Sequence, residues 1–221
     1  MTTDIAPLLD YGLVRRHESA TIFVHRTDTT YLVLGSRQPA SVLREEARRA
    51  STLRRRRGGG GIVELHPDGI WVDWWIPASD PRWTPDIRHA ADRVGAWWRT
   101  ALERHGAGSV SVHAGPVSGA AEHLVICFAG RGPGEVFVSG RKAVGLMQWR
   151  VREGALLSTQ IPARPATRIV PMLAAPPPGI ASELHHHTVG TLGLRDTSSL
   201  VETLANLGGP WAREFVDHPA G

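Results

Sequence analysis

The sequence predicts an α+β fold with a mixed, largely antiparallel sheet packed by helices. Short apolar runs bounded by glycine-rich turns recur along the chain, which is typical of strands. Few of these runs alternate strictly with helical segments, so a regular succession of strand and helix is not expected. The expected strands are residues 20–26, 31–36, 62–65, 70–76, 109–113, 123–129, 135–139, 143–151 and 155–161.

The clearest helix is expected at residues 85–105. Thr84 is the candidate N-cap, and Gly106 is the candidate end of the helix. An apolar stripe at helical spacing predicts the buried face of this helix. The stripe contains Ile87, Ala91, Val94, Trp98 and Leu102.

Two further helices and a proline-rich connection complete the expected organisation. Residues 39–50 predict a short helix, and the four residues from Ser199 match a capping box that opens a C-terminal helix. A proline-rich connection precedes that helix. We therefore expect a main domain over residues 1–170 and a C-terminal helical extension, residues 171–221, packed on it.

Composition restricts the class of protein. A chain of 221 residues, 42% of them hydrophobic, can bury a core without disulfides or a structural metal. The single cysteine, Cys127, cannot form an internal disulfide and favours the cytoplasm. No signal-peptide pattern is present, and no apolar run approaches the ~18 residues of a membrane span. We therefore expect a cytoplasmic protein without a membrane partner.

The chain is basic, with a formal net charge of +4 and a sequence pI of about 10.1. This charge favours acidic partners such as a phosphorylated ligand, an acidic protein or nucleic acid. Charge is the sole indication of nucleic-acid binding, so that partner is not the expected one. The basic residues gather in one stretch, typical of a solvated face or an anion-binding patch. It contains Arg44, Arg48, Arg49, Arg54, Arg55, Arg56 and Arg57.

Three motifs contain residue types that could take part in ligand binding or catalysis. Arg55 to Val63 is an arginine pair followed by four glycines, whose backbone N–H groups can bind an anion; a tight hairpin with solvated arginines is the structural alternative. Lys142 is the only lysine against 24 arginines, which favours a specific need for an ammonium, although one stray surface lysine gives the same count. Cys127 ends an apolar run and is either a small core residue or a nucleophile beside a cation.

Together these residues resemble the lipoate–protein ligase and octanoyltransferase family, in the superfamily that also contains the biotin–protein ligases. The family's Arg-Arg-x-Ser/Thr-Gly-Gly-Gly stretch is matched with Gly58 in the Ser/Thr place. Its Gly-Arg-Lys motif, small-residue strand and Gln are matched by Gly140 to Gln148. The Cys-Phe pair of one octanoyltransferase subgroup is matched at Cys127. The resemblance covers roughly residues 20–165.

The resemblance implies a biotin/lipoate ligase catalytic domain-like fold, with residues 1–170 as the acyl-binding catalytic domain. In the family, the glycine-rich loop and the lysine hold the acyl chain or its adenylate. By resemblance, Lys142 and Cys127 are the candidate catalytic residues. The candidate substrate-binding residues are Arg55, Arg56, Gly59, Gly60, Gly61, His66, Gly140, Gly145 and Gln148.

The activity that the resemblance implies is transfer of an octanoyl or lipoyl group to a lysine of a lipoyl domain, with a Cys acyl-enzyme as one route. The expected partners are an acyl carrier protein and lipoyl-domain acceptors. No tightly bound cofactor is expected; lipoate or octanoate is a substrate, and ATP and Mg²⁺ enter only for a ligase. The alternatives are an ATP-dependent lipoate ligase, a biotin ligase, and a non-catalytic acyl- or nucleotide-binding homologue.

Two departures bear on the substrate. Leu146 and Met147 stand where the family has Ser and Ala, and larger residues there would narrow or reshape the acyl tunnel. Leu156 to Gln160 lack the histidine that the family usually shows. The run His185 to His187 invites a metal interpretation, but no second ligand pair at zinc spacing accompanies it, so a surface turn is expected and no metal site.

Overall fold

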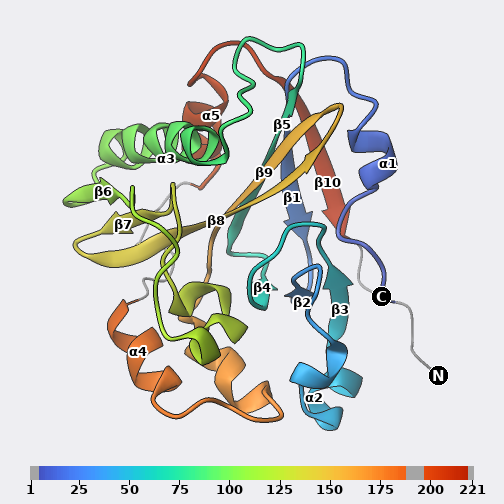
Figure 1. Ribbon diagram of the computed structural model, residues 1–221, viewed down its shortest axis with the longest axis vertical. Helices are drawn as coiled ribbons and strands as arrows, with labels where there is room; N and C mark the ends of the chain where they lie inside the picture. Colours follow the sequence, from blue (N-terminus) through green and yellow to red (C-terminus); the bar gives the residue numbers. More distant parts are fainter. Residues whose placement is uncertain (1–4, 188–196, 219–221) are drawn as a thin grey trace.

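A computed structural model describes residues 5–187 and 197–218 of the chain (Figure 1). Within these residues, seven strands form the main sheet in the order β10-β1-β5-β9-β8-β7-β6, and three form a second sheet in the order β3-β2-β4. The main-sheet strands are β1 (Thr21–Thr27), β5 (Ile70–Pro77), β6 (Val110–Val112), β7 (Val136–Val138), β8 (Arg141–Val151), β9 (Gly154–Ile161) and β10 (Ala212–His218). The second sheet contains β2 (Tyr31–Leu34), β3 (Thr52–Arg55) and β4 (Val63–Leu65).

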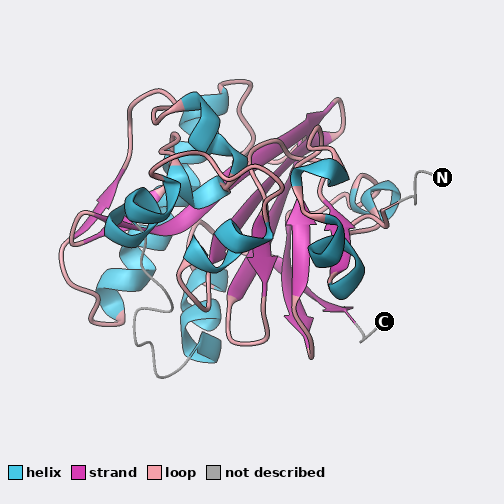
Figure 2. Cartoon of the chain, turned by 90° about the horizontal axis from the view of Figure 1, so that it is seen from below, coloured by secondary structure: helices cyan, strands magenta, loops and turns pink. Residues whose placement is uncertain are grey.

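Helices lie around these sheets, as the view from below also shows (Figure 2). The α-helices are α1 (Tyr11–Val14), α2 (Glu45–Ala50), α3 (Ile87–Arg104), α4 (Ile180–His187) and α5 (Thr197–Ala205). The 3₁₀ helices are η1 (Ala40–Val42), η2 (Ala121–Val125), η3 (Cys127–Ala129) and η4 (Ala166–Met172). Each sheet has one parallel pair, β1–β10 and β2–β3, and its other pairs are antiparallel. The expected fold class, a mixed and largely antiparallel sheet with helices, is confirmed.

One face of the main sheet packs against α3 and α5. Alternation along β5 places Ile70, Val72, Trp74 and Ile76 in this core, as predicted. The opposite face of β5, including Trp71 and Trp75, belongs to two other apolar clusters. β8, which pairs first with β7 and then with β9, carries several of the residues described in the next subsection.

Helix α3 begins two residues later than the sequence suggested. Asp86, rather than Thr84, is the N-cap, because its carboxylate accepts hydrogen bonds from the N–H groups of Arg88 at 2.8 Å and His89 at 3.0 Å. Thr84 instead accepts from the N–H of Asp86. Ile87 therefore lies in the first turn and is 58% exposed, whereas the rest of the predicted stripe is buried.

The expected strand 123–129 is wrong. These residues form the 3₁₀ helices η2 and η3, and an isolated β-bridge joins Ile62 and Ile126. Ile126 and Phe128 are buried, so the apolar run reflects burial rather than a ladder of strand pairing. A short buried run does not distinguish a strand from a helical turn by its pattern alone.

The C-terminal segment combines helices with a strand. Ser199 lies inside α5, which begins by Thr197, so the proposed capping box does not start this helix. Leu200 and Leu204 of α5 pack into the core against α3. β10 then runs parallel to β1 and extends the main sheet, so residues 171–221 are not purely helical. None of the described helices combines the length and hydropathy of a bilayer-spanning helix.

Candidate functional site

A cleft of about 700 Å³ opens beside β8 at the point where this strand changes its neighbour. β7 pairs with β8 as far as Val144, and β9 pairs with it from Gly145 onwards. The cleft brings together several residues that the two sequence motifs predicted. These are Gly59, Gly60, Gly61, Cys127, Lys142 and Gln148.

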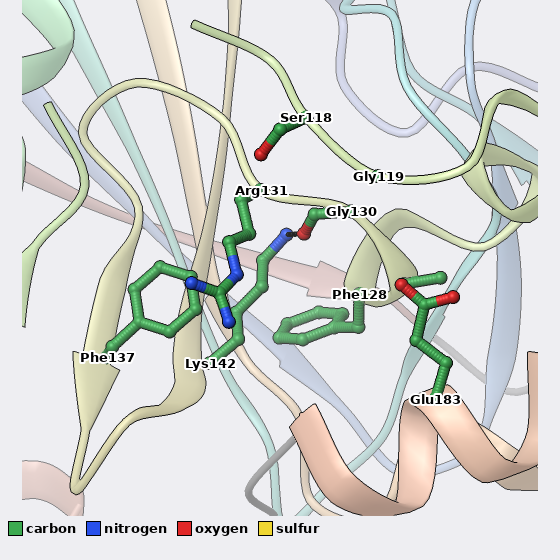
Figure 3. A pocket seen from close by; sticks show the side chains of 9 residues that line it. Ser118, Gly119, Phe128, Gly130, Arg131, Phe137, Lys142 and Glu183 are labelled. Carbon is green, nitrogen blue, oxygen red and sulfur yellow. Dashed lines mark hydrogen bonds between the residues drawn. The ribbon is translucent and has the colours of Figure 1, made fainter. Parts of the chain in front are cut away.

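Lys142 lies in the wall of this cleft and is 1% exposed. Its ammonium contacts Oε1 of Glu135 at 2.7 Å and donates to the carbonyls of Cys127 and Gly130, each at 2.9 Å. The ring of Phe128 lies 5.1 Å from Nζ (Figure 3). A buried ammonium is tolerated only when it is paired, and here three acceptors match its three N–H donors.

Glu135 completes this arrangement, and the sequence analysis missed it. Its carboxylate also accepts from the N–H of Gly132 at 2.7 Å and of Leu146 at 3.4 Å. Burial raises the pKa of Glu135, and the nearby Lys142 opposes that rise. No pattern in the sequence marks this residue, because its role depends on the β7–β8 hairpin bringing it beside the lysine.

Arg56 holds the glycine loop from inside. The side chain is 1% exposed and donates to the carbonyls of Val33 at 3.0 Å, Gly59 at 2.9 Å and Gly61 at 2.6 Å. Burial lowers the pKa of Arg56, and the nearby Cys127 opposes this shift. Gly60 adopts φ 86°, a conformation that favours glycine. Arg56 therefore organises the loop.

Arg55 points elsewhere. Its guanidinium donates to the carbonyls of Gly35 at 2.8 Å and Gln38 at 2.6 Å, and it does not line the cleft. The arginine-rich stretch as a whole does not form one surface patch. Arg56 is buried, and both Arg48 and Arg49 pair with Glu45.

Cys127 presents a free, partly buried thiol to the cleft. A Cβ placed on either Gly60 or Gly145 would lie 3.9 Å from its Sγ, so the thiol is between the glycine loop and β8. The backbone of Cys127 is fixed from both sides, since its N–H donates to Ile62 and its carbonyl accepts from Lys142. The structure thus brings both predicted catalytic residues to one wall.

Gly145 and Gln148 belong to the same region. A Cβ at Gly145 would lie 3.2 Å from the ring of Phe128, so glycine lets that ring approach β8. Gln148 lines the cleft and donates to the carbonyl of Ile87 at 2.7 Å. This hydrogen bond joins β8 to the first turn of α3.

His66 and Gly140, like Arg55, Arg56 and Gly145, are not among the residues that line the cleft. His66 lies in the β4–β5 turn, where its Nδ1 accepts from the N–H of Asp68 at 3.1 Å. Gly140 lies in the β7–β8 turn with φ 77°, next to Ser139 with φ 50°. Both residues lie in turns.

Cations dominate the rim of the cleft. Arg37 and Arg131 line it and are exposed, and both were missed from the sequence. A second cavity of about 130 Å³ lies on the other side of Lys142, where Arg131 stacks over Phe137 at 5.1 Å (Figure 3). With Lys142, these cations favour an anionic ligand or an acidic partner.

A metal centre is not indicated by the described residues, which contain no group of three or more His, Cys, Asp or Glu side chains that could hold an ion. The histidine run lies in α4 rather than in a surface turn, and the rings of His185 and His186 stack edge to face at 5.5 Å.

Solved structures of lipoate ligases resemble this chain. A lipoate-protein ligase A bound with ATP superposes with a TM-score of 0.66 at 14% identity, over 89% of this chain and 76% of that one. The chain has the lipoate–protein ligase fold. A Thermoplasma acidophilum bipartite lipoate protein ligase, solved with its E2 lipoyl domain, gives 0.66 at 13% identity, over 96% and 80% of the two chains.

A third structure, a lipoate protein ligase from T. acidophilum with bound lipoic acid, gives 0.64 at 14% identity and covers 96% of this chain and 82% of that one. Neither a protein-family model nor a curated protein sequence matches the chain. The lipoate ligase fold is therefore established by structure, while the residues of the cleft bear on activity.

Proposed function

We propose that the protein transfers an octanoyl or lipoyl group to a lysine of a lipoyl domain. The observation that carries this proposal is the buried ammonium of Lys142 in the wall of a cleft of about 700 Å³ that the glycine loop and Cys127 also line. Solved neighbours of the same fold are described with lipoic acid, ATP and a lipoyl domain. The acyl chain would occupy the cleft, and the acceptor lysine would enter from its open side.

The chemistry begins with a thioester on an acyl carrier protein. The thiol of Cys127 gives up its proton and attacks the acyl carbonyl; the bond from the carbonyl to the carrier's sulfur breaks, and that sulfur takes up the proton as it leaves. The acceptor amine then attacks the Cys127 thioester, forming an amide and returning the thiol. In both steps an oxyanion develops, and Lys142 stabilises it by exchanging one of its three present acceptors for the substrate oxygen.

The partners follow from charge. Arg37 and Arg131 at the rim would attract an acidic carrier or an acidic lipoyl domain. The arginine-rich stretch contributes less than its composition suggests, because Arg56 is buried and others are paired. Raising the salt concentration should therefore slow association mainly through these two rim arginines.

Intact-mass spectrometry tests this route. Incubation with octanoyl carrier protein should add one octanoyl group to the wild-type chain, and Cys127→Ser should remain unmodified while keeping its melting temperature. A wild-type chain that modifies a lipoyl domain without ever carrying the acyl group would exclude the Cys127 step.

ATP-dependent ligation is a second candidate, favoured by the similarity to a ligase bound with ATP. The same cations would hold the phosphate of an acyl-adenylate, and Mg²⁺ would find one carboxylate in the cleft, that of Glu135. Fatty-acid-dependent exchange of pyrophosphate into ATP would establish this route. Tight acyl binding with neither exchange nor transfer would instead identify a non-catalytic binder.

A further inference from the structure

Two cavities share three lining residues, Cys127, Leu146 and Met147. The outer one is the cleft of about 700 Å³, and the inner one is an apolar space of about 20 Å³ beneath it, which Val63, Trp71 and Phe128 help to line. Met147 contributes to the walls of both. The inner space has room for about one water molecule, so it does not admit an acyl chain while Met147 keeps this position.

The side chain of Met147 is packed directly on the glycine loop. A Cβ built on Gly58 would lie 1.7 Å from Sδ of Met147 and 3.0 Å from its Cε. No side chain at position 58 is compatible with this rotamer, because such contacts are far inside van der Waals distance. Gly58 and Met147 are thus complementary in size, and the thioether fills the space that the glycine leaves.

Three of the described residues that line the inner cavity have buried polar atoms without a hydrogen-bond partner. Among the described residues, Nε of Arg56, Oγ of Ser158 and Oε1 of Gln160 are buried without a partner, and all three residues line this cavity. The residues are 1%, 3% and 5% exposed. None of these polar atoms contributes to the cavity surface, which is apolar, so the space suits a hydrocarbon chain rather than a polar group.

We propose that Met147 is the specificity-determining residue for acyl length: the chain of a saturated medium-length acyl group ends against its thioether, and the inner cavity is the closed continuation of the same site. This inference rests on the proposed acyl-transfer function and adds the substrate feature that the site measures. Ser158, opposite Met147 on β9, marks where a longer chain would pass once the thioether is removed.

Met147→Ala tests this directly. The substitution removes Cγ, Sδ and Cε, so it should lengthen the site by about the space of three chain atoms. In the wild type, affinity for the series hexanoate to tetradecanoate, measured by calorimetry, should rise about fourfold per methylene and stop rising when the chain reaches Met147. In Met147→Ala the rise should continue for about two or three further methylenes.

Two further variants control for misfolding and for the general effect of replacing a methionine. Met147→Val shortens the side chain but suits a strand, so it should fold well and give a smaller shift in the same direction. Met172→Ala is the matched control, because it makes the same substitution at a partly buried methionine of η4 outside both cavities, and it should leave the length profile unchanged.

The outcomes separate the two proposals when transfer from acyl carrier proteins is measured alongside binding. A longer optimum in both Met147 variants, with Met172→Ala unchanged, supports the inference even if no acyl group is transferred, which would overturn the proposed function alone. Transfer with an unchanged optimum in folded Met147→Ala and Met147→Val overturns the inference alone. A wild type that binds no acid of any length overturns both.

Discussion

Replacing Lys142 with methionine keeps most of the length of the side chain and removes its charge. The carboxylate of Glu135 would then remain buried with two backbone N–H donors, those of Gly132 and Leu146. Removing one partner of a buried ion pair typically costs about 3–5 kcal/mol. We expect a loss of this size in the free energy of unfolding, because Glu135 is only 4% exposed.

The loss should depend on pH in a defined direction. Burial already raises the pKa of Glu135, and without Lys142 it should rise further. The folded variant would then hold a proton that the unfolded chain releases near pH 4.3. Its stability should therefore be greatest at low pH and fall as the pH rises through the pKa of the folded state.

A second substitution separates stability from chemistry. Glu135→Gln in the Lys142→Met background removes the stranded charge, and an uncharged pair of similar volume is often as stable as the ion pair. We expect the double variant to recover to within about 1–2 kcal/mol of the wild type. Acyl transfer should nevertheless stay about 10²–10³-fold below the wild type, the usual loss of one oxyanion donor.

Unfolding in urea, followed by tryptophan fluorescence, gives the free energy of unfolding of each variant. Octanoyl transfer to a lipoyl domain gives its activity. Lys142→Arg, which keeps the charge, should lose transfer by a similar factor of about 10²–10³ because a planar fork does not fit three converging acceptors. A coupling energy between the two positions below about 0.5 kcal/mol would refute the buried pair. Restored transfer in the double variant would refute the role of the ammonium.

Three further predictions concern the loop, the nucleophile and the sheet edge. Gly60→Ala should destabilise the protein by about 1–2 kcal/mol, because φ 86° strains any residue with a Cβ, and it should also weaken acyl binding. The control Gly140→Ala should cost similar stability without affecting binding. Urea titration measures the stability of both variants, and calorimetry measures their acyl binding. Cys127→Ser should abolish the acyl-enzyme while the unfolding midpoint stays within a few degrees, as intact mass and thermal melts would show. Burial lowers the pKa of His218 to about 4. The free energy of unfolding should therefore fall by about 1–2 kcal/mol, allowing for solvent screening, as the pH drops from about 6.5 to about 4. In a His218→Gln variant, the free energy of unfolding should not show this dependence on pH.

The pH effect at His218 depends on the groups around it. Its Nε2 lies 2.8 Å from Nδ1 of His25, whose Nε2 lies 2.9 Å from the buried carboxylate of Asp73. His25 and Arg54 lower the pKa of His218, and Asp73 and Asp217 oppose them. Since His218 ends β10 and His25 lies on β1, protonation would weaken the pairing that attaches the C-terminal strand.

Sequence reasoning was most successful where pattern and chemistry coincide. The alternation along β5 and the spacing along α3 predicted their buried faces, because burial on one side imposes a period. The glycine loop and Lys142, far apart in the chain, could both be singled out because they are unusual local features, and both line one cleft. Their partners Glu135, Arg37 and Arg131 are ordinary residues whose positions only the folded topology specifies.

The errors have equally local causes. Residues 123–129 have the composition of a strand, but Gly61 lies so close that a Cβ there would be 2.4 Å from the carbonyl of Leu124, and the segment folds over the loop as 3₁₀ turns. His66 and Gly140 lie in turns away from the cleft, and their predicted binding roles stay predictions. A motif match does not separate residues that touch a ligand from residues that shape the chain around it.

Two differences from the family pattern lie in contact in the structure. Gly58 stands in the family's Ser/Thr position, and Met147 stands where the family has Ala. In the structure they are in contact, and the side chain lost at position 58 is replaced by the one gained at position 147. The thioether of Met147 therefore fills the space beside Gly58 and also lines the inner cavity.

The same geometry explains why a chain with 24 arginines keeps one lysine. Arg55 and Arg56 each bridge carbonyls spread along a turn or loop, and a planar fork with several N–H groups suits acceptors that lie apart. The acceptors around position 142 converge on one point: a carboxylate and two carbonyls, each within 2.9 Å of Nζ. A tetrahedral ammonium satisfies all three with a single atom, and exchanging any one of them for a substrate oxygen leaves the other two in place. A compact charge with three N–H donors therefore suits position 142, and under the proposed function one of those donors would turn to the substrate.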